Sequence, residues 1–236
     1  MPAGAGLIRE GARSMCGRFT LMLDAEELVS EFDLQQVPAD VFPRYNIAPS
    51  QPLLVVTDWG SRRAEWMRWG LVPSWAKDPS IGSKMINARS ETVQEKPSFR
   101  NAFNRRRCLI LADGFYEWRR AAGKGPATPY YFHMVPNKPF AFAGLWEFWR
   151  SPEGDDLRTC TILTTQANGI VAPVHERMPV ILNRERMAAW LTPAPAETLM
   201  SFLTPLPDAE LAAIPVSRLV NSPENDGPEL VLPLAG

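Results

Sequence analysis

The sequence predicts an α+β fold: a single domain of mainly antiparallel strands, curled into a barrel-like sheet, with a few short helices at its periphery. Three observations lead to this class. The chain has 236 residues, enough for one large domain with a buried core. Short runs rich in Val, Leu and aromatic residues recur along it, separated by turn-forming residues. No internal repeat and no long linker divides it.

The first 14 residues differ from the rest of the chain. They are rich in Gly and Ala, and they contain no apolar run long enough for a signal peptide. Either translation begins at Met15 or a short leader is removed. In both cases we expect residues 15–236 to form the domain, with Cys16 as its functional N-terminus.

The first helix is predicted by its cap. Asp24 and Glu27 have the spacing of a capping box, in which each residue binds the other's backbone N–H. Leu28 and Phe32 follow at helical spacing, so a short helix is expected over residues 25–32.

The remaining elements follow from local sequence patterns. Strands are predicted at residues 53–57, 65–71, 108–112, 115–118, 129–134, 140–146 and 159–165. Helices are predicted at residues 97–104, 183–191 and 196–203, extended segments at 44–49 and 215–221, and loops at 38–43 and 121–125. Pro97 suits a first helical position and Asn183 a helix cap. Asp113 and Gly114 form a turn signal, which predicts that the strands on either side of them make a hairpin.

Composition excludes several classes of protein. No run approaches the roughly 18 apolar residues of a membrane span. The three Cys residues are widely spaced without a C-x-x-C motif, and there are only two His residues. This argues against a structural zinc site and against a disulfide framework. We therefore expect a cytoplasmic monomer without metal or other cofactor.

Basic residues concentrate in the middle of the chain. The formal net charge is −1, but residues 62–124 contain 14 Lys and Arg against 6 Asp and Glu. A basic segment inside an otherwise acidic chain suggests one positive face that attracts a polyanion. The alternative, charges scattered over the whole surface, stays open at this level.

Met15-Cys16 is the most informative dipeptide. If Cys16 is the first residue, its α-amine and its thiol lie on adjacent carbons, and both have reference pKa values near 8. An aldehyde can form a Schiff base with such an amine, and the thiol can then close a five-membered thiazolidine ring. The alternative is that Cys16 is a small buried apolar residue, as most free Cys residues are.

Other candidate residues have a structural and a functional interpretation. Glu117 lies among aromatic residues, either on the surface of an alternating strand or as a carboxylate tuned for acid–base work. His175, one of two His residues, is either structural or a proton carrier. Asn87 and Arg89 are of the types that anchor phosphate and sugar oxygens.

Six motifs in register resemble one known family. They are Met15-Cys16-Gly17-Arg18-Phe19, Tyr45-Asn46-Ile47-Ala48-Pro49, Trp69-Gly70-Leu71-Val72-Pro73-Ser74-Trp75, Asn87-Ala88-Arg89-Ser90-Glu91, Gly114-Phe115-Tyr116-Glu117-Trp118 and His175-Glu176-Arg177-Met178-Pro179. From Met15 to about Leu232 the chain resembles the SRAP (SOS response-associated peptidase) family. Each motif is weak by itself, and their common order makes the resemblance specific.

The resemblance implies an SRAP-like domain that senses abasic sites in single-stranded DNA. Its N-terminal Cys would crosslink covalently to the ring-opened sugar and shield the lesion, after an autopeptidase step that exposes it. β-Elimination from the Schiff base would make lyase activity a side reaction. The family's catalytic residues correspond here to Cys16, Asn87, Glu117 and His175, and its DNA-binding residues to Arg18, Pro49, Trp75, Arg89 and Thr164.

Within the resemblance, each residue has an expected role. Glu117 would be the acid–base group at the forming ring, and His175 would assist sugar ring opening and crosslink reversal. Arg18 and Arg89 would contact phosphate. A wedge of Pro49 and Trp75 would stack on a base and Thr164 would line the pocket, while Asn87 would position the sugar or catalytic groups. Where family members show a second aromatic residue after that Trp, this chain has Ala76, so the stacking platform is expected to be smaller.

Two other functions compete with this one. A cysteine hydrolase would use the Cys16 thiolate with His175, oriented by Asn87 or Glu117. A non-catalytic single-strand DNA-binding module would use the basic middle segment and the tryptophans. The α-amine distinguishes the hydrolase, which does not need Cys16 at a chain terminus. The binding module leaves Cys16, Glu117 and His175 without a role.

Overall fold

The computed structural model describes residues 16–120 and 125–234. The expected leader at residues 1–14 lies outside this part of the chain, as does most of the loop expected at 121–125. Within the described residues, no helix combines the length and apolar character needed to cross a membrane.

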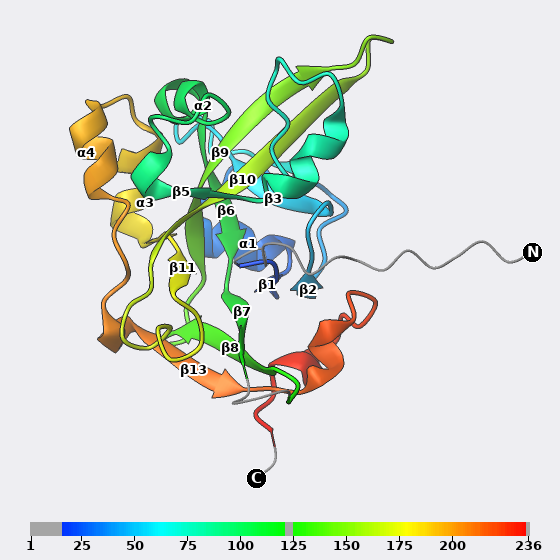
Figure 1. Ribbon diagram of the computed structural model, residues 1–236, viewed down its shortest axis with the longest axis vertical. Helices are drawn as coiled ribbons and strands as arrows, with labels where there is room; N and C mark the ends of the chain where they lie inside the picture. The colour runs from blue at the N-terminus through cyan, green and yellow to red at the C-terminus, as the bar shows by residue number, and fades with distance from the viewer. Residues whose placement is uncertain (1–15, 121–124, 235–236) are drawn as a thin grey trace, which may run out of the picture.

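Five strands close into a barrel (Figure 1). They are β3 (Pro52–Val56), β4 (Ala64–Trp69), β6 (Arg107–Ala112), β9 (Phe140–Arg150) and β10 (Asp156–Gln166). Antiparallel pairing runs in the order β4–β3–β6–β9–β10. Parallel pairing of β10 with β4 then closes the ring. The barrel-like sheet predicted from sequence is therefore confirmed, and closure leaves these strands no free edge over the paired length.

Short strands extend the barrel wall. β5 (Asn87–Arg89) pairs in parallel with β10, and β11 (Arg177–Pro179) pairs with β10 farther along. β12 (Ile181–Leu182) pairs with β9. Two of the sequence motifs thus come together on β10, although about 90 positions separate them in the chain.

A second sheet lies beside the barrel. Its five strands follow the order β13 (Leu211–Pro215), β8 (Thr128–Met134), β7 (Gly114–Arg119), β1 (Phe19–Leu21) and β2 (Arg44–Ile47). The extended segment expected at residues 215–221 was misplaced, because the strand ends at Pro215 and a 3₁₀ turn follows.

The predicted hairpin at Asp113-Gly114 is wrong. β6 belongs to the barrel and β7 to the second sheet, so the chain passes from one sheet to the other at Asp113. The Asp113 carboxylate is buried and accepts hydrogen bonds from the Thr20 hydroxyl and the Met22 N–H, which fixes the passage. A Cβ on Gly114 would lie only 2.3 Å from Cζ of Tyr131, so glycine is required by packing there.

Four α-helices lie around the sheets in the described part of the chain. They are α1 (Ala25–Phe32), α2 (Arg100–Arg105), α3 (Arg184–Leu191) and α4 (Ala196–Ser201). The described residues also form five 3₁₀ turns: η1 (Pro79–Lys84), η2 (Ser90–Thr92), η3 (Asp208–Glu210), η4 (Arg218–Asn221) and η5 (Pro228–Val231). The capping box at Asp24 and the cap at Asn183 are confirmed. The second helix begins at Arg100, three residues after Pro97, so Pro97 is not its first residue.

One apolar core fills the barrel and continues toward the second sheet. Phe19 of β1 packs edge-on against Trp69 of β4 and Phe142 of β9, with ring centroids 5.3 and 5.5 Å apart. Cys16 belongs to the same cluster and is 1% exposed. The segment around Cys16 therefore lies where the two sheets meet.

Candidate active site

Cys16 and Glu117 are in direct contact. The backbone nitrogen of Cys16 donates a hydrogen bond to Oε1 of Glu117 at 2.6 Å, across 101 positions of sequence. β1 follows Cys16 closely and pairs with β7, which carries Glu117, so the sheet holds the two residues together. The predicted acid–base group thus lies beside the nitrogen that would become the α-amine.

The Glu117 carboxyl is buried, with 5% of the residue exposed. Burial raises its pKa to about 7, against the opposing effect of hydrogen bonds from the Cys16 and Trp118 N–H groups. At neutral pH both protonation states are populated. A carboxyl group in this condition can act either as an acid or as a base.

The Cys16 thiol is in a different electrostatic state. Burial raises its pKa well above the ordinary value, and the negative charge of Glu117 adds to the effect. Reactive thiolates usually have lowered pKa values and lie near positive charge. The Cys16 thiol has a raised pKa and a negatively charged neighbour instead. The backbone of Cys16 is also strained: its φ is +40°, in the left-handed region that non-glycine residues rarely adopt.

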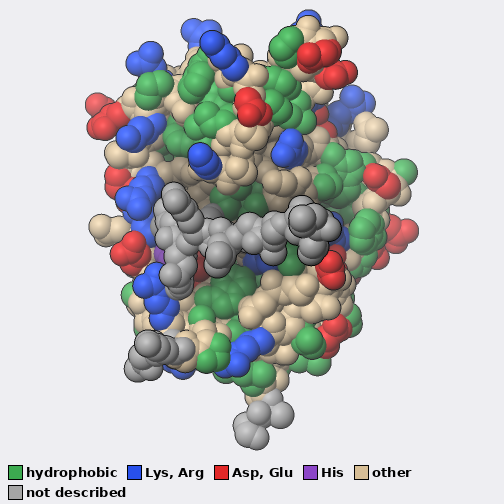
Figure 2. Space-filling model, turned by 45° about the vertical axis from the view of Figure 1, so that its right-hand side comes forward, with side chains coloured by type: hydrophobic (Ala, Val, Ile, Leu, Met, Phe, Trp, Pro, Cys, Tyr) green, Lys and Arg blue, Asp and Glu red, His purple; other side chains and the backbone are tan. Residues whose placement is uncertain are grey.

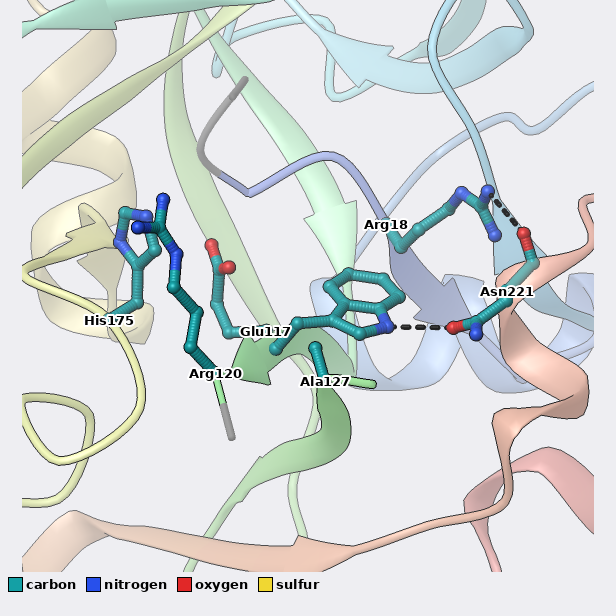
Figure 3. A pocket seen from close by; sticks show the side chains of 7 residues that line it. Arg18, Glu117, Arg120, Ala127, His175 and Asn221 are labelled. Atoms are coloured by element: carbon teal, nitrogen blue, oxygen red, sulfur yellow. Dashed lines mark hydrogen bonds between the residues drawn. The ribbon is translucent and has the colours of Figure 1, made fainter. Parts of the chain in front are cut away.

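Glu117 and His175 face one cavity of about 540 Å³. Its lining residues are Arg18, Glu117, Trp118, Arg120, Ala127, His175 and Asn221. Figure 3 shows the Glu117 carboxylate and the His175 ring pointing into the cavity from β7 and from the loop before β11, with Arg120 beside the His175 ring. The two predicted proton carriers are therefore placed at one site.

The His175 ring is held by backbone groups. Its Nδ1 lies 3.1 Å from the backbone nitrogen of Arg177, which donates to it, and 3.3 Å from the Arg177 carbonyl oxygen. The N–H donates to Nδ1 when that nitrogen carries no proton, whereas the carbonyl accepts from Nδ1 when it does, so the two contacts suit different tautomers.

Asn87, Arg89 and Thr164 lie on adjacent strands. β5 carries Asn87 and Arg89 and runs parallel to β10, with Arg89 opposite Thr164. Arg89 is exposed and lines a second hollow of about 430 Å³ beside Glu176 and Arg177. Thr164 is fully buried, and its side-chain and backbone oxygens accept from Arg177. Thr164 therefore faces Arg177 and not the cavity surface.

Arg18 has a structural role in addition to any contact with DNA. Its guanidinium donates to Oδ1 of Asn46 at 2.9 Å and to the carbonyl oxygens of Val220 and Asn221 at 2.6 and 3.2 Å. These bonds attach the 3₁₀ turn η4 to β2 and to the residue that precedes β1. Burial lowers the pKa of Arg18 from its ordinary value, and the group lines the cavity edge.

The expected wedge residues lie on two connected loops. Pro49 is half-buried between β2 and β3, and the next residue, Ser50, donates its N–H to the Trp69 carbonyl at 3.0 Å. Trp75 follows β4 and is 59% exposed. The indole of Trp149 anchors that loop through the Ala76 carbonyl. The end of β4 thus brings both loops to the same part of the barrel.

The residues that sequence reasoning missed are Arg120, Trp118 and Asn221. Arg120 gave only the general signal of a basic segment, and Asn221 in the Pro-rich tail gave none. Trp118 donates its indole N–H to Oδ1 of Asn221 at 2.7 Å, which closes one side of the cavity (Figure 3). On the face shown in Figure 2, Lys and Arg side chains lie in both the upper and the lower half of the molecule.

Comparison with known proteins identifies relatives over most of the chain. Residues 15–223 match the family described as SOS response associated peptidase (SRAP). The chain is 46% identical over 222 residues to the Bacillus subtilis (strain 168) abasic site processing protein YoqW, covering 92% of this chain and 99% of that protein. It is 36% identical over 226 residues to the Gallus gallus abasic site processing protein HMCES, covering 81% and 66%.

A crystal structure of a protein from Bacteroides thetaiotaomicron has the same fold. It superposes with a TM-score of 0.85 at 25% identity, covering 93% of this chain and all of that one. The likeness therefore extends over most of the chain.

Proposed function

We propose that this chain, which belongs to the SOS response associated peptidase (SRAP) family, processes abasic sites in single-stranded DNA. It would do so by forming a covalent crosslink through Cys16. The observation that carries the proposal is the 2.6 Å contact between the Cys16 nitrogen and the Glu117 carboxylate, in a cavity shared with His175. Such a crosslink would shield the lesion.

The chemistry begins with the sugar. The C1′–O4′ bond of the abasic deoxyribose breaks, the C1′ hydroxyl loses its proton, and O4′ gains one as the aldehyde forms. His175 lines the cavity, and its ring is suited to supply that proton and to take it back during reversal. Asn87, on the neighbouring β5, would position the sugar.

The crosslink then needs both nucleophiles of Cys16. The α-amine adds to the aldehyde, and loss of one water gives a Schiff base. The thiol sulfur adds to the imine carbon and the thiol proton passes to nitrogen, which closes the thiazolidine ring. Glu117, with a pKa of about 7, can protonate the departing hydroxyl and accept protons from the amine and the thiol. β-Elimination from the Schiff base would account for a lyase side activity.

Exposure of the α-amine requires removal of the preceding residues. In the proposed autopeptidase step the Cys16 thiol adds to the carbonyl carbon of residue 15, and the bond from that carbon to the Cys16 nitrogen breaks. Protonated Glu117, already hydrogen-bonded to this nitrogen, protonates it, and the thiol proton returns to the carboxylate. Water hydrolyses the resulting thioester. The positive φ of Cys16 supports this step, because cleavage releases that strain.

The competing cysteine hydrolase is disfavoured by the same geometry. It would pair the Cys16 thiol with His175, whereas the side chain that contacts Cys16 is Glu117. The contact of Glu117 with the nitrogen of Cys16, and not with His175, favours chemistry at the α-amine.

Incubation with an abasic single-stranded oligonucleotide tests the proposal. A shifted band on a denaturing gel is expected for the abasic oligonucleotide and not for its intact counterpart. In a chain that starts at Met15, where removal of the Met exposes residue 16 without the thiol, Cys16→Ser keeps the α-amine and loses the thiol, so it should give only an adduct that needs borohydride to survive. Absence of an abasic-specific band with the wild type would reject the proposal.

A further inference from the structure

One buried side chain connects three segments of the site. Arg177 in β11 has only 10% of its side chain exposed, and its guanidinium donates to both carboxylate oxygens of Glu91 at 2.5 and 2.9 Å. The same guanidinium donates to the Thr164 carbonyl at 2.7 Å. A two-pronged Arg–carboxylate pair fixes direction as well as distance.

Each end of this pair adjoins a proposed functional residue. Glu91 lies in η2, directly after the β5 strand that carries Asn87 and Arg89. Arg177 is two residues after His175. The pair therefore joins the loop of His175 to the strand of Asn87, with Thr164 of β10 between them.

The His175 ring depends on Arg177 most directly. Both backbone groups near its Nδ1 belong to Arg177, at 3.1 and 3.3 Å. A shift of the Arg177 backbone would rotate or release the ring. The backbone is held in turn by the pairing of Arg177 with Gln166 on β10 and by the side-chain bonds to Glu91.

We propose that Arg177 and Glu91 form a positioning pair that sets the His175 ring for proton transfer at Nε2. The inference rests on the proposed function of His175 and adds two residues to it. Neither the Arg177 guanidinium nor the Glu91 carboxylate needs to touch DNA for this role. The hydrogen bonds from Arg177, and to a smaller extent its charge, lower the pKa of Glu91, so this carboxylate stays ionised across the neutral range.

Glu91→Gln in the full chain is the main test, because Gln keeps the size and one acceptor oxygen. The crosslink is first formed with a labelled abasic oligonucleotide, and excess unlabelled abasic oligonucleotide is then added. The rate at which labelled oligonucleotide is released from the protein is measured on denaturing gels. Release should slow by roughly 10- to 100-fold, the range expected when a catalytic group is misplaced by about 1 Å. Cleavage before Cys16, followed by intact mass, uses Glu117 and should stay at the wild-type rate.

Two further variants control for a general loss of structure. Glu65→Gln breaks the ion pair between Glu65 and Arg158, which lies on the barrel wall, and should leave both rates unchanged. Arg177→Lys keeps the charge but not the two-pronged geometry, and should slow release by less than Glu91→Gln while the protein stays folded.

The double variant Glu91→Gln/His175→Ala separates positioning from structure. If Glu91 acts through His175, the double variant should release no more slowly than His175→Ala alone. Additive losses, or an equal loss in the cleavage rate, would overturn the inference. If Glu91→Gln releases at the wild-type rate while His175→Ala is slow, the positioning role of Arg177 and Glu91 is overturned and the proposed role of His175 stands. If His175→Ala also releases at the wild-type rate, the proposed role of His175 falls as well.

Discussion

At the scale of single residues, Glu117 combines a proposed chemical role with a cost in stability. Its pKa is raised from 4.5 to about 7 by burial. Below about pH 4.5 the carboxyl is protonated in both the folded and the unfolded chain. Between about 4.5 and 7 the unfolded chain ionises first, so the free energy of unfolding falls as pH rises through this window.

We therefore predict that Glu117→Gln stabilises the folded protein at pH 8. The two proteins should be compared with Cys16→Ala also present. That substitution prevents self-cleavage and keeps the backbone N–H of residue 16 as a hydrogen-bond donor. The gain should be up to about 3 kcal/mol at pH 8 and close to zero at pH 4, measured by urea unfolding. Glu65→Gln, on a half-exposed pair, should show no such gain. Equal stabilisation by Glu117→Gln at both pH values would contradict the assigned pKa.

The proposed proton transfers by Glu117 and His175 give a second prediction. Glu117→Gln should slow cleavage before Cys16 and ring closure, whereas His175→Ala should slow sugar opening and crosslink release. General acid–base groups contribute about 10²- to 10⁴-fold, so losses of that order are expected. Single-turnover rates for each step provide the measurement. Wild-type rates in both variants would mean that neither residue transfers protons.

The two arginines at the DNA-binding positions should behave differently from each other. Arg89 is exposed, so Arg89→Ala should leave the melting temperature unchanged and lower the log–log salt slope of binding by about 0.7. Arg18 bonds Asn46 and the backbone of η4, so Arg18→Ala should weaken binding and also lower the melting temperature. If Arg18→Ala melts at the wild-type temperature, these bonds contribute nothing to stability.

At the scale of elements, the passage from β6 to β7 was the main surprise. The sequence Asp113-Gly114 is typical of a hairpin turn, and nothing local indicates that the flanking strands enter different sheets. The reason is tertiary: Asp113 binds Thr20 and Met22, about 90 positions earlier, and Gly114 admits the Tyr131 ring. Helices with strong local signals, such as α1 with its capping box, were predicted correctly.

Gly114→Ala tests the packing explanation for this passage. The added methyl group would lie within 2.4 Å of three atoms of Tyr131, which is buried and cannot move away. We expect a loss of about 1–3 kcal/mol in the free energy of unfolding, typical of overpacking. Gly17→Ala is the control, because no atom lies within 4 Å of its Cβ position. Similar effects of the two substitutions would show that close packing at Gly114 is not the constraint.

At the scale of the whole molecule, the sequence predicted the fold class but not the arrangement of the candidate site. Short apolar runs separated by turn residues were enough to predict the α+β barrel. The order of the motifs proposed Cys16, Glu117 and His175 as site residues. Their mutual geometry could not be predicted, because the Cys16–Glu117 contact spans 101 positions and depends on strand pairing. The roles of Arg177 and Glu91 were invisible for the same reason: a long-range ion pair has no local sequence signal.

The two sheets determine the surroundings of Cys16. The core buries its thiol, and the pairing of β1 with β7 places its nitrogen on Glu117. While residue 15 is attached, that nitrogen is an amide and cannot attack an aldehyde. Cleavage before Cys16 must therefore precede crosslinking.

The most direct test follows the full chain with an abasic oligonucleotide by intact-mass spectrometry over time. Stable adduct should appear only after a lag that tracks loss of residues 1–15, and its mass should equal that of the chain from Cys16 plus the oligonucleotide minus one water. Peptide mapping should place the nucleotide on Cys16. A stable adduct on a chain that still carries residues 1–15 would contradict the central claim.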